Sequence, residues 1–520
     1  MMQLLSRSLL RGATCALCVM GCGSGPSDAT KLSSAHAPLA EDEVLVTSTS
    51  RFHTSVGIAE RLDDLSANPP EIHLQTGASF IRITGTPVAG GWLFTGVPRT
   101  EYYLRTHPLS RADILTSARH VDIGTHHIGR ADAEYPGVDG VPVQLNLRNL
   151  SPWRRLTGQY QPGSSLQAVA TDVDMVGDLL VPENTPEGAT SIVTDESFLV
   201  AYNLMSMPVF QANAGDRMYV HQSSEFTAGG MPDGTRVGYS SVERSVHLPP
   251  LDFVPEWGPS PLTIDAELQP LPLQEFPLDW RLSEFAPQAS QVHPRALPGT
   301  IWFEIHPTPH TSAEQWMGFT QPLLRLLIPR GSASDFAAHL RYGNPYPSSW
   351  DVVGRVNYST VYAAQMSGNP SRTINLVGGY TAVEKLEDLA SGPIAPKLSP
   401  PRSLRIDWKS ASTSREVSSV HPVISWRPPA VGTPTAYRVI VRQLFSQFGT
   451  TSTTGSISVP ASIQELRLPP GLLTSGPQFY VSVIAVNAPH WDVEQAPLST
   501  QERVPYHSAT AYSSIFTVAP

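Results

Sequence analysis

Apolar and polar residues alternate along much of the chain, which is the pattern of β-strands. The clearest run spans 141–147, and its apolar members are Val141, Val143, Leu145 and Leu147. Because successive side chains of a strand point to opposite faces, these four share one face. The same alternation recurs at 437–442 and 479–487. It predicts a mainly β fold of several β-sandwich modules in tandem, with the apolar faces turned toward cores between sheets.

Other short apolar runs between turn residues predict further strands. They lie at 44–48, 80–84, 198–204, 217–221, 236–248, 301–305, 323–328 and 352–362. Two segments, 332–340 and 381–389, are predicted to be helical. In the second, Ala382, Leu386 and Leu389 share a helix face. The sequence contains no fixed-period repeat that would indicate a propeller.

The last part of the chain resembles a fibronectin type III domain. The residues that carry the resemblance are Trp426 followed by Pro428-Pro429, Tyr437-x-Val439, Leu468-Pro469-Pro470-Gly471 and Val483-x-Ala485-Val486-Asn487. The resemblance implies an immunoglobulin-like sandwich over 400–520. Phe479 stands where that family has a tyrosine that ties its corner by a hydrogen bond. Either packing alone holds the corner, or the strand is bulged by one residue.

A second stretch, 91–104, resembles carboxypeptidase-regulatory-like sandwiches. It combines Trp92-Leu93-Phe94, Val97-Pro98 and Tyr102-Tyr103-Leu104, with Thr100 where that family has glycine. From the residues themselves we expect two antiparallel strands around a proline-led turn, with aromatic side chains at the seam.

The chain of 520 residues is too long for one core. Its 49 prolines exclude long helices, because an interior proline removes a backbone donor and clashes with the preceding turn. We predict a signal peptide at 1–21, a lipidated flexible tether at 22–40 and a β-sandwich module at 41–125. A large β-rich region of one or two sandwich domains follows at 126–395. A proline-rich joint at 393–401 precedes the C-terminal module.

The N-terminal segment has the pattern of a bacterial export signal. Arg7 and Arg11 precede a short apolar stretch, and Val19-Met20-Gly21-Cys22 resembles the lipobox of bacterial lipoproteins. The resemblance implies a lipid on Cys22 that anchors the protein to a membrane. The expected location is the bacterial cell envelope, at the outer membrane or the cell surface.

The cysteine distribution agrees with this interpretation. All three cysteines lie within the first 22 residues, so the exported chain would keep only an acylated Cys22 and form no disulfide. The formal charge of -10 argues against nucleic acid as a partner, because no basic stretch is available to displace counterions from phosphates. A protein or a polysaccharide is the expected partner besides the membrane.

Few residues suggest a catalytic, metal-binding or ligand-binding site. Glu304 and His306 share a strand face, and with His310 they could ligate a divalent metal. The alternative is a polar strand end broken by Pro307 and Pro309. His126-His127 is expected to lie in a polar surface loop. Among aromatic candidates for sugar stacking, Trp316 is the best candidate for an exposed ring, but we expect it to pack in a core.

Two functions remain open from the sequence. The first is a non-catalytic, surface-anchored lipoprotein that binds or scaffolds through its modules, without a cofactor. The second is an extracellular hydrolase with its active site in 126–395, for which Glu304 with Glu314 or Asp335 are the nominees.

Overall fold

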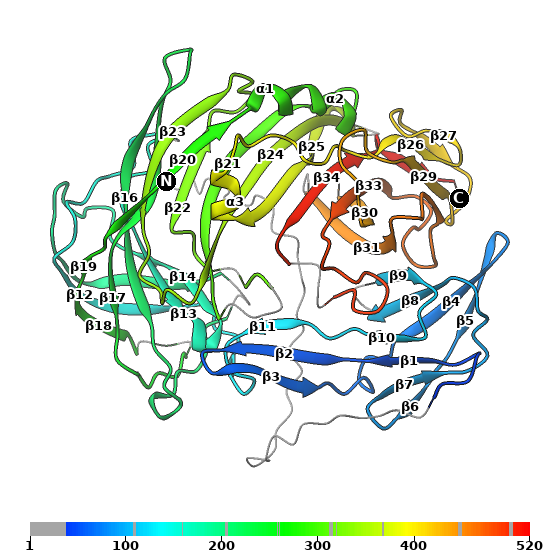
Figure 1. Ribbon diagram of the computed structural model, residues 1–520, viewed down its shortest axis with the longest axis horizontal. Coiled ribbons are helices and arrows are strands. Elements are labelled where there is room, and N and C mark those ends of the chain that lie inside the picture. Colours follow the sequence, from blue (N-terminus) through cyan, green and yellow to red (C-terminus); the bar gives the residue numbers. More distant parts are fainter. Residues whose placement is uncertain are drawn as a thin grey trace.

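A computed structural model describes residues 38–107, 111–158, 160–202, 206–256, 258, 260–310, 316–318, 320–366, 369–445, 450–498 and 503–519. The predicted signal peptide, Cys22 and most of the predicted tether lie outside these residues. The described chain is mainly β and folds as sandwiches in tandem, as the alternation predicted (Figure 1). Within the described residues, no helix is long and apolar enough to cross a bilayer.

The first sandwich packs two sheets face to face. One sheet has the order β10-β1-β7-β6 and the other contains β4, β5, β8 and β9. The bounds are Val44–Thr47 (β1), Glu71–Thr76 (β4), Ser79–Ile83 (β5), Thr86–Val88 (β6), Gly91–Phe94 (β7), Tyr102–His107 (β8), Ala112–Thr116 (β9) and His120–Asp122 (β10). Val44, Phe94, Tyr102 and Leu104 are fully buried between the sheets.

The expected pairing of the two strands within 91–104 is wrong. β7 pairs with β1 and β6, whereas β8 pairs with β4 and β9 in the opposite sheet. The proline-led turn therefore crosses from one sheet to the other. The aromatic residues of both strands meet in the core because the strands face each other across it.

A three-stranded arm extends from this sandwich. It consists of Thr49–Thr54 (β2), Gly57–Leu62 (β3) and His126–Ile128 (β11). β2 follows β1 directly and pairs with β11 in parallel, as β1 pairs with β10. Figure 1 shows the arm running from the first sandwich to the middle of the chain.

The middle of the chain begins with a sheet that curls around its own core. Its strands are Gly140–Arg148 (β12), Ser165–Ala170 (β13), Met175–Leu180 (β14), Ile192–Ala201 (β15), Tyr219–Gly230 (β16), Arg236–His247 (β17), Leu262–Glu267 (β18) and Gln269–Pro270 (β19). β18 pairs with β12, and β19 pairs with β17, so the two ends of the sheet meet. The four apolar residues predicted to share a face of β12 are all buried in this core.

A second sandwich follows and shares β17. Leu297–Thr308 (β21), Leu324–Ile328 (β22), Asp351–Met366 (β24) and Asn369–Lys385 (β25) extend the sheet from β17. Leu273–Trp280 (β20) and Phe336–Gly343 (β23) pair as a separate two-stranded sheet that contributes Phe276, Trp280 and Leu340 to the common core. Short helices at Leu282–Phe285 (α1) and Ala289–Val292 (α2) lie before β21.

Both helical predictions need correction. Residues 336–343 form β23, where Phe336, Leu340 and Tyr342 lie buried on the core face and pairing with β20 overrides the local preference. In 381–389, β25 continues to Lys385, and only Leu386–Ala390 is helical (α3).

The C-terminal part is an immunoglobulin-like sandwich. One sheet contains Arg402–Ile406 (β26), Lys409–Ser410 (β27), Val423–Arg427 (β29) and Glu465–Arg467 (β32). The other contains Ala436–Phe445 (β30), Thr450–Pro460 (β31), Gln478–Asn487 (β33), Tyr506–Tyr512 (β34) and Phe516–Val518 (β35), with the short Arg415–Val417 (β28) beside β35. The pairing of β33 with β30 has no register shift, and Phe479 is buried near Phe516. Packing, rather than a bulge, therefore holds the corner.

Neighbouring sandwiches are joined by strands that pair across their boundaries, and not by linkers alone. β25 pairs with β34, and β31 pairs with β9 of the first sandwich (Figure 1). The proline-rich joint is packed as well, since Leu398 and Ser399 are fully buried and the Ser399 hydroxyl accepts hydrogen bonds from the backbone of 430 and 431. The first sandwich and its arm thus contact both the middle and the C-terminal part.

A buried ion pair lies where the first and last sandwiches meet. Arg105 donates from Nε and Nη2 to the two carboxylate oxygens of Asp113, over 2.8 and 2.9 Å. Nη2 also donates to the carbonyl of Pro470 over 2.8 Å, and the Tyr103 hydroxyl donates to the carbonyl of Arg467. The side chains of Arg105 and Asp113 are 8% and 0% exposed, so the ion pair forms its hydrogen bonds with protein groups and not with bulk water.

Candidate functional site

Glu304 and His306 meet on β21 as their spacing predicted. His306 Nε2 lies 3.0 Å from a carboxylate oxygen of Glu304, and Nδ1 lies 3.0 Å from the carbonyl of Thr320. Both ring nitrogens therefore face acceptor oxygens, which occupies the positions that a metal would need. Burial would raise the pKa of Glu304, but the hydrogen bond and charge of His306, with Arg325 at 3.2 Å, lower it to about 2.

The structure does not bring His310 into this pair. His310 follows the end of β21 with a φ of 51°, and its ring packs edge-on against Trp350 at 5.2 Å. Across the described ranges, no three histidine, cysteine or acidic side chains are grouped to hold a metal ion. The candidate trio of Glu304, His306 and His310 is therefore not assembled, because the chain turns away after Thr308.

The nominated hydrolase carboxylates are not assembled into a pair either. Asp335 accepts a hydrogen bond from the backbone of Ser283 at 3.0 Å and faces Arg281 at 3.4 Å. Glu314 lies outside the described residues. A general acid needs a pKa near the working pH. Glu304, whose pKa is lowered by its cationic neighbours, has the wrong environment for that role.

Trp316 is buried, in agreement with the expected packing in a core. The side chain is 8% exposed and stacks on His53 and His126, with ring centroids 4.3 and 5.2 Å away. The arm covers it, since His53 belongs to β2 and His126 to β11. His126-His127 is accordingly a strand and not a surface loop, and His127 stacks on Phe52.

Two histidines lie at the joint between the arm and the middle of the chain, where the arm packs on Trp316, and both are held neutral. His53 Nε2 and His126 Nδ1 lie 2.7 Å apart, so one donates to the other. Burial, followed by the charge of His310, lowers the pKa of His53 to about 4. Burial, followed by the charge of His53, lowers that of His126 to about 3. The joint is therefore a packing contact that depends on pH.

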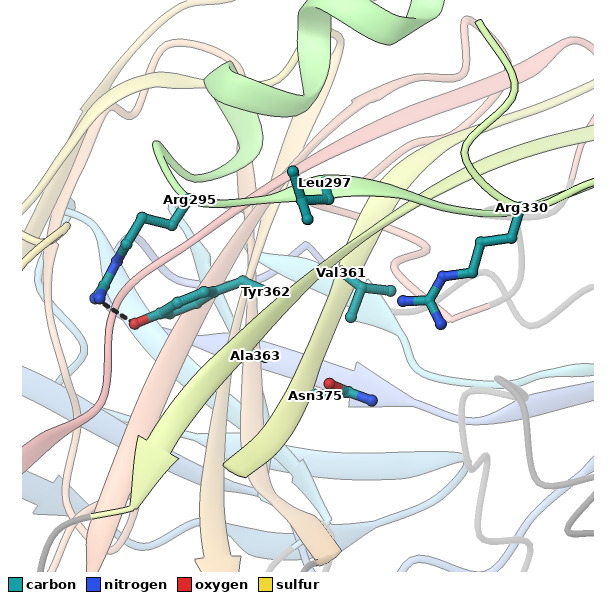
Figure 2. Close-up of a pocket in the computed structure, with 7 residues that line it drawn as sticks. All are labelled: Arg295, Leu297, Arg330, Val361, Tyr362, Ala363 and Asn375. Carbon is teal, nitrogen blue, oxygen red and sulfur yellow. Dashed lines mark hydrogen bonds between the residues drawn. The ribbon is translucent and has the colours of Figure 1, made fainter. Parts of the chain in front are cut away.

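A groove that opens to solvent lies on the outer side of β21, β24 and β25 (Figure 2). Strand register builds its floor, because Leu297 lies opposite Val361 and Ala363 lies opposite Asn375. Directly opposed residues of antiparallel strands share a face. Leu297 is 68% exposed, which leaves an apolar strip facing water. The volume of the groove is about 210 Å³.

Two arginines flank the groove. Arg295 precedes β21, and its guanidinium lies 4.7 Å from the centre of the Tyr362 ring and donates to the Tyr362 hydroxyl. Arg330 follows β22 and extends from the other side (Figure 2). In the part of the chain that the structure describes, no carboxylate forms an ion pair with either guanidinium. Neither charge is therefore neutralised by a carboxylate of those ranges, and the guanidinium of Arg295 is turned toward Tyr362, whose side chain lies on the buried side of β24 (Figure 2).

The sequence did not single out the tryptophan that is most exposed among the described residues. Trp408 is 60% exposed and lies with Asp407 in the two-residue turn between β26 and β27. Both residues have positive φ, 47° for Asp407 and 60° for Trp408. Such a turn normally carries Asn-Gly or Asp-Gly, because a bulky side chain is strained there. The sequence signal that could have indicated this turn was an aspartate in a two-residue gap between strands.

Replacement of Trp408 by glycine is expected to raise the free energy of unfolding of the C-terminal sandwich by about 0.5–1 kcal/mol. The left-handed conformation costs an ordinary residue ~1–2 kcal/mol, and glycine avoids this cost. Part of the resulting stabilisation is offset because glycine has greater conformational freedom in the unfolded state. Chemical denaturation measures the change. The control Arg405→Gly, in β26 nearby, is expected to destabilise, and a clear loss for Trp408→Gly would contradict the strain.

Comparison with known proteins gives no family. No protein-family model matches the sequence, and no curated protein matches it. Among solved structures, the crystal structure of the FN1–FN3 domains of chicken CNTN1 is 8% identical, with a TM-score of 0.14. The match covers 71% of this chain and 100% of that chain. The immunoglobulin-like fold of the C-terminal part therefore rests on its own strand pairing.

Proposed function

We propose that the protein is a non-catalytic, lipid-anchored scaffold of the bacterial envelope that binds a carboxylate-bearing polysaccharide in the arginine-flanked groove. The observation that carries the proposal is the pair of guanidiniums, Arg295 and Arg330, on either side of an exposed apolar strip. The fibronectin type III resemblance of the C-terminal sandwich fits a spacer or recognition module.

Each part of the groove suits one part of such a ligand. Guanidinium groups bind carboxylates through paired hydrogen bonds, and stacking on Tyr362 fixes the plane of Arg295 in advance. Leu297 and Val361 offer an apolar surface to the ring face of a sugar, and the Asn375 amide can bond hydroxyl groups. The open form of the groove lets a polymer pass through, whereas an enclosed cavity would select a small molecule.

The anchor is proposed from the lipobox-like Val19-Met20-Gly21-Cys22. We expect Cys22→Ser to abolish incorporation of a radioactive or clickable fatty acid into the protein in bacterial cells. Wild-type protein should be labelled in the same experiment. Continued labelling of Cys22→Ser would contradict lipidation at this residue.

Replacement of both groove arginines is expected to weaken polysaccharide binding at least tenfold. Hydrogen bonds to a charged group contribute about 1.5–3 kcal/mol each, and exposure to water reduces that contribution. The measurement is isothermal titration of polygalacturonate into wild type and into Arg295→Gln/Arg330→Gln. Arg236→Gln, an exposed arginine at the start of β17, is the matched control. Equal affinity of all three proteins would overturn the groove as the site.

A further inference from the structure

We propose that the Asp407–Trp408 turn is a contact tip that docks the folded part of the protein onto an anionic lipid surface. This inference rests on the proposed lipid anchor and adds a second attachment to it. Trp408 supplies the inserted side chain, and Lys409 and Arg405 supply positive charge beside it. None of these residues belongs to the arginine-flanked groove.

The geometry of the tip leaves Trp408 facing solvent. The turn contains only two residues, because Ile406 already pairs with Lys409. Asp407 is held inward, since its carboxylate accepts a hydrogen bond from the backbone of Val423 over 2.9 Å and its backbone N–H donates to the carbonyl of the same residue. Trp408 has no such role in the sandwich and is 60% exposed.

Its exposure sets Trp408 apart within the molecule. It is the most exposed tryptophan in the described ranges, whereas tryptophans on which the cores depend, such as Trp280 and Trp426, are buried. The left-handed backbone conformation at this position is energetically unfavourable for tryptophan. A residue that is strained and leaves most of its aromatic surface in solvent is a candidate for contact with something else.

The shape and charge of the tip favour a membrane over a sugar chain. A tight hairpin turn is convex, whereas sugar sites need a concave surface with converging polar groups. Tryptophan partitions to the headgroup region of bilayers, and neighbouring Lys and Arg side chains are attracted by anionic lipids. Arg405 and Lys409 are both exposed beside the turn.

The chain between Cys22 and the fold is short enough to keep an anchored protein close to a bilayer. Residues 23–37 separate the proposed lipid on Cys22 from the described fold, and they span at most about 50 Å when fully extended. An anchored protein therefore presents its surface to the membrane at high effective concentration. A contact too weak to bind from solution suffices under that condition.

The test uses the acylated protein with a single label near the tip. Because the three natural cysteines all lie within the first 22 residues, Ser410→Cys gives one thiol in the processed chain for an environment-sensitive dye. The protein is reconstituted into phosphatidylcholine vesicles with or without phosphatidylglycerol. Flotation with the vesicles reports the anchor, and dye emission reports the tip, so failure of one is distinct from failure of the other.

We expect a blue shift of the dye with anionic vesicles and none with neutral vesicles. Trp408→Gly should abolish the shift, and Lys409→Gln should lower the ratio of docked to undocked tips about fivefold. A dye on Val193→Cys, which is 76% exposed on β15, is the control and should not respond. A floating protein whose tip emission ignores lipid composition would overturn the proposal. So would a shift caused by polygalacturonate instead of lipid.

Discussion

Replacement of Asp113 by alanine is expected to destabilise the contact between the first and last sandwiches by about 3–5 kcal/mol, because breaking a buried ion pair leaves an uncompensated charge. Asp113 receives both guanidinium hydrogen bonds of Arg105, and its side chain is fully buried. Among the described residues, the remaining guanidinium would keep the carbonyl of Pro470 as its hydrogen-bond acceptor. We expect β9 to separate from β31.

Thermal unfolding and backbone hydrogen exchange measure this effect. Exchange should accelerate in β9 and β31 of Asp113→Ala while the core around β12 stays protected. The matched control is Asp265→Ala, which breaks an exposed ion pair with Arg148 and is expected to change little. Equal behaviour of the two variants would show that the buried pair does not hold the sandwiches together.

Acidification from pH 7 to pH 4 is expected to loosen the joint between the arm and the middle of the chain. The pKa of His53 is lowered to about 4 and that of His126 to about 3, from an ordinary 6.5. Below pH 6.5 the separated state therefore binds protons that the packed state does not. Stability falls as the pH drops from 6.5 toward 4. Cations that face the two rings, Arg51 and Arg503, and the neighbouring His127 and His310 act in the same direction.

The pH dependence of the unfolding midpoint tests this joint. His53→Phe/His126→Phe keeps aromatic contact with Trp316 and removes two titrating groups, so its midpoint should fall less between pH 6.5 and 4 than that of wild type. Other buried histidines, such as His221 and His293, leave part of the slope in place. His490→Phe, at an exposed position, serves as the control. Identical slopes in the wild type and the double variant would contradict the expectation.

Strands with one buried face were predictable because the side-chain period of a strand is two. β12, β30 and β33 bury the residues that alternation assigned to their core faces. The predictions for 91–104 and 332–340 failed for a different reason. Which sheet receives β8, and whether 336–343 is a strand, depend on partners distant in the sequence.

The candidate groove was beyond sequence reasoning for the same physical reason. Leu297, Val361 and Asn375 become neighbours only through the register of three strands. Exposure of tryptophans depends on tertiary contacts too. Trp316 lies in a polar stretch, but the arm buries it, whereas Trp408 follows a short strand and is left outside by its turn.

The affinity of the mature protein for polygalacturonate, compared with fully methyl-esterified polygalacturonate, tests the central claim most directly. Esterification keeps the sugar chain and removes the carboxylate charge that Arg295 and Arg330 would bind. The titration belongs at about 0.15 M salt, where the Debye length of about 8 Å screens the overall charge of the protein. We expect saturable binding of the acid and at least tenfold weaker binding of the ester. Equal binding of both, or of neither, would contradict it.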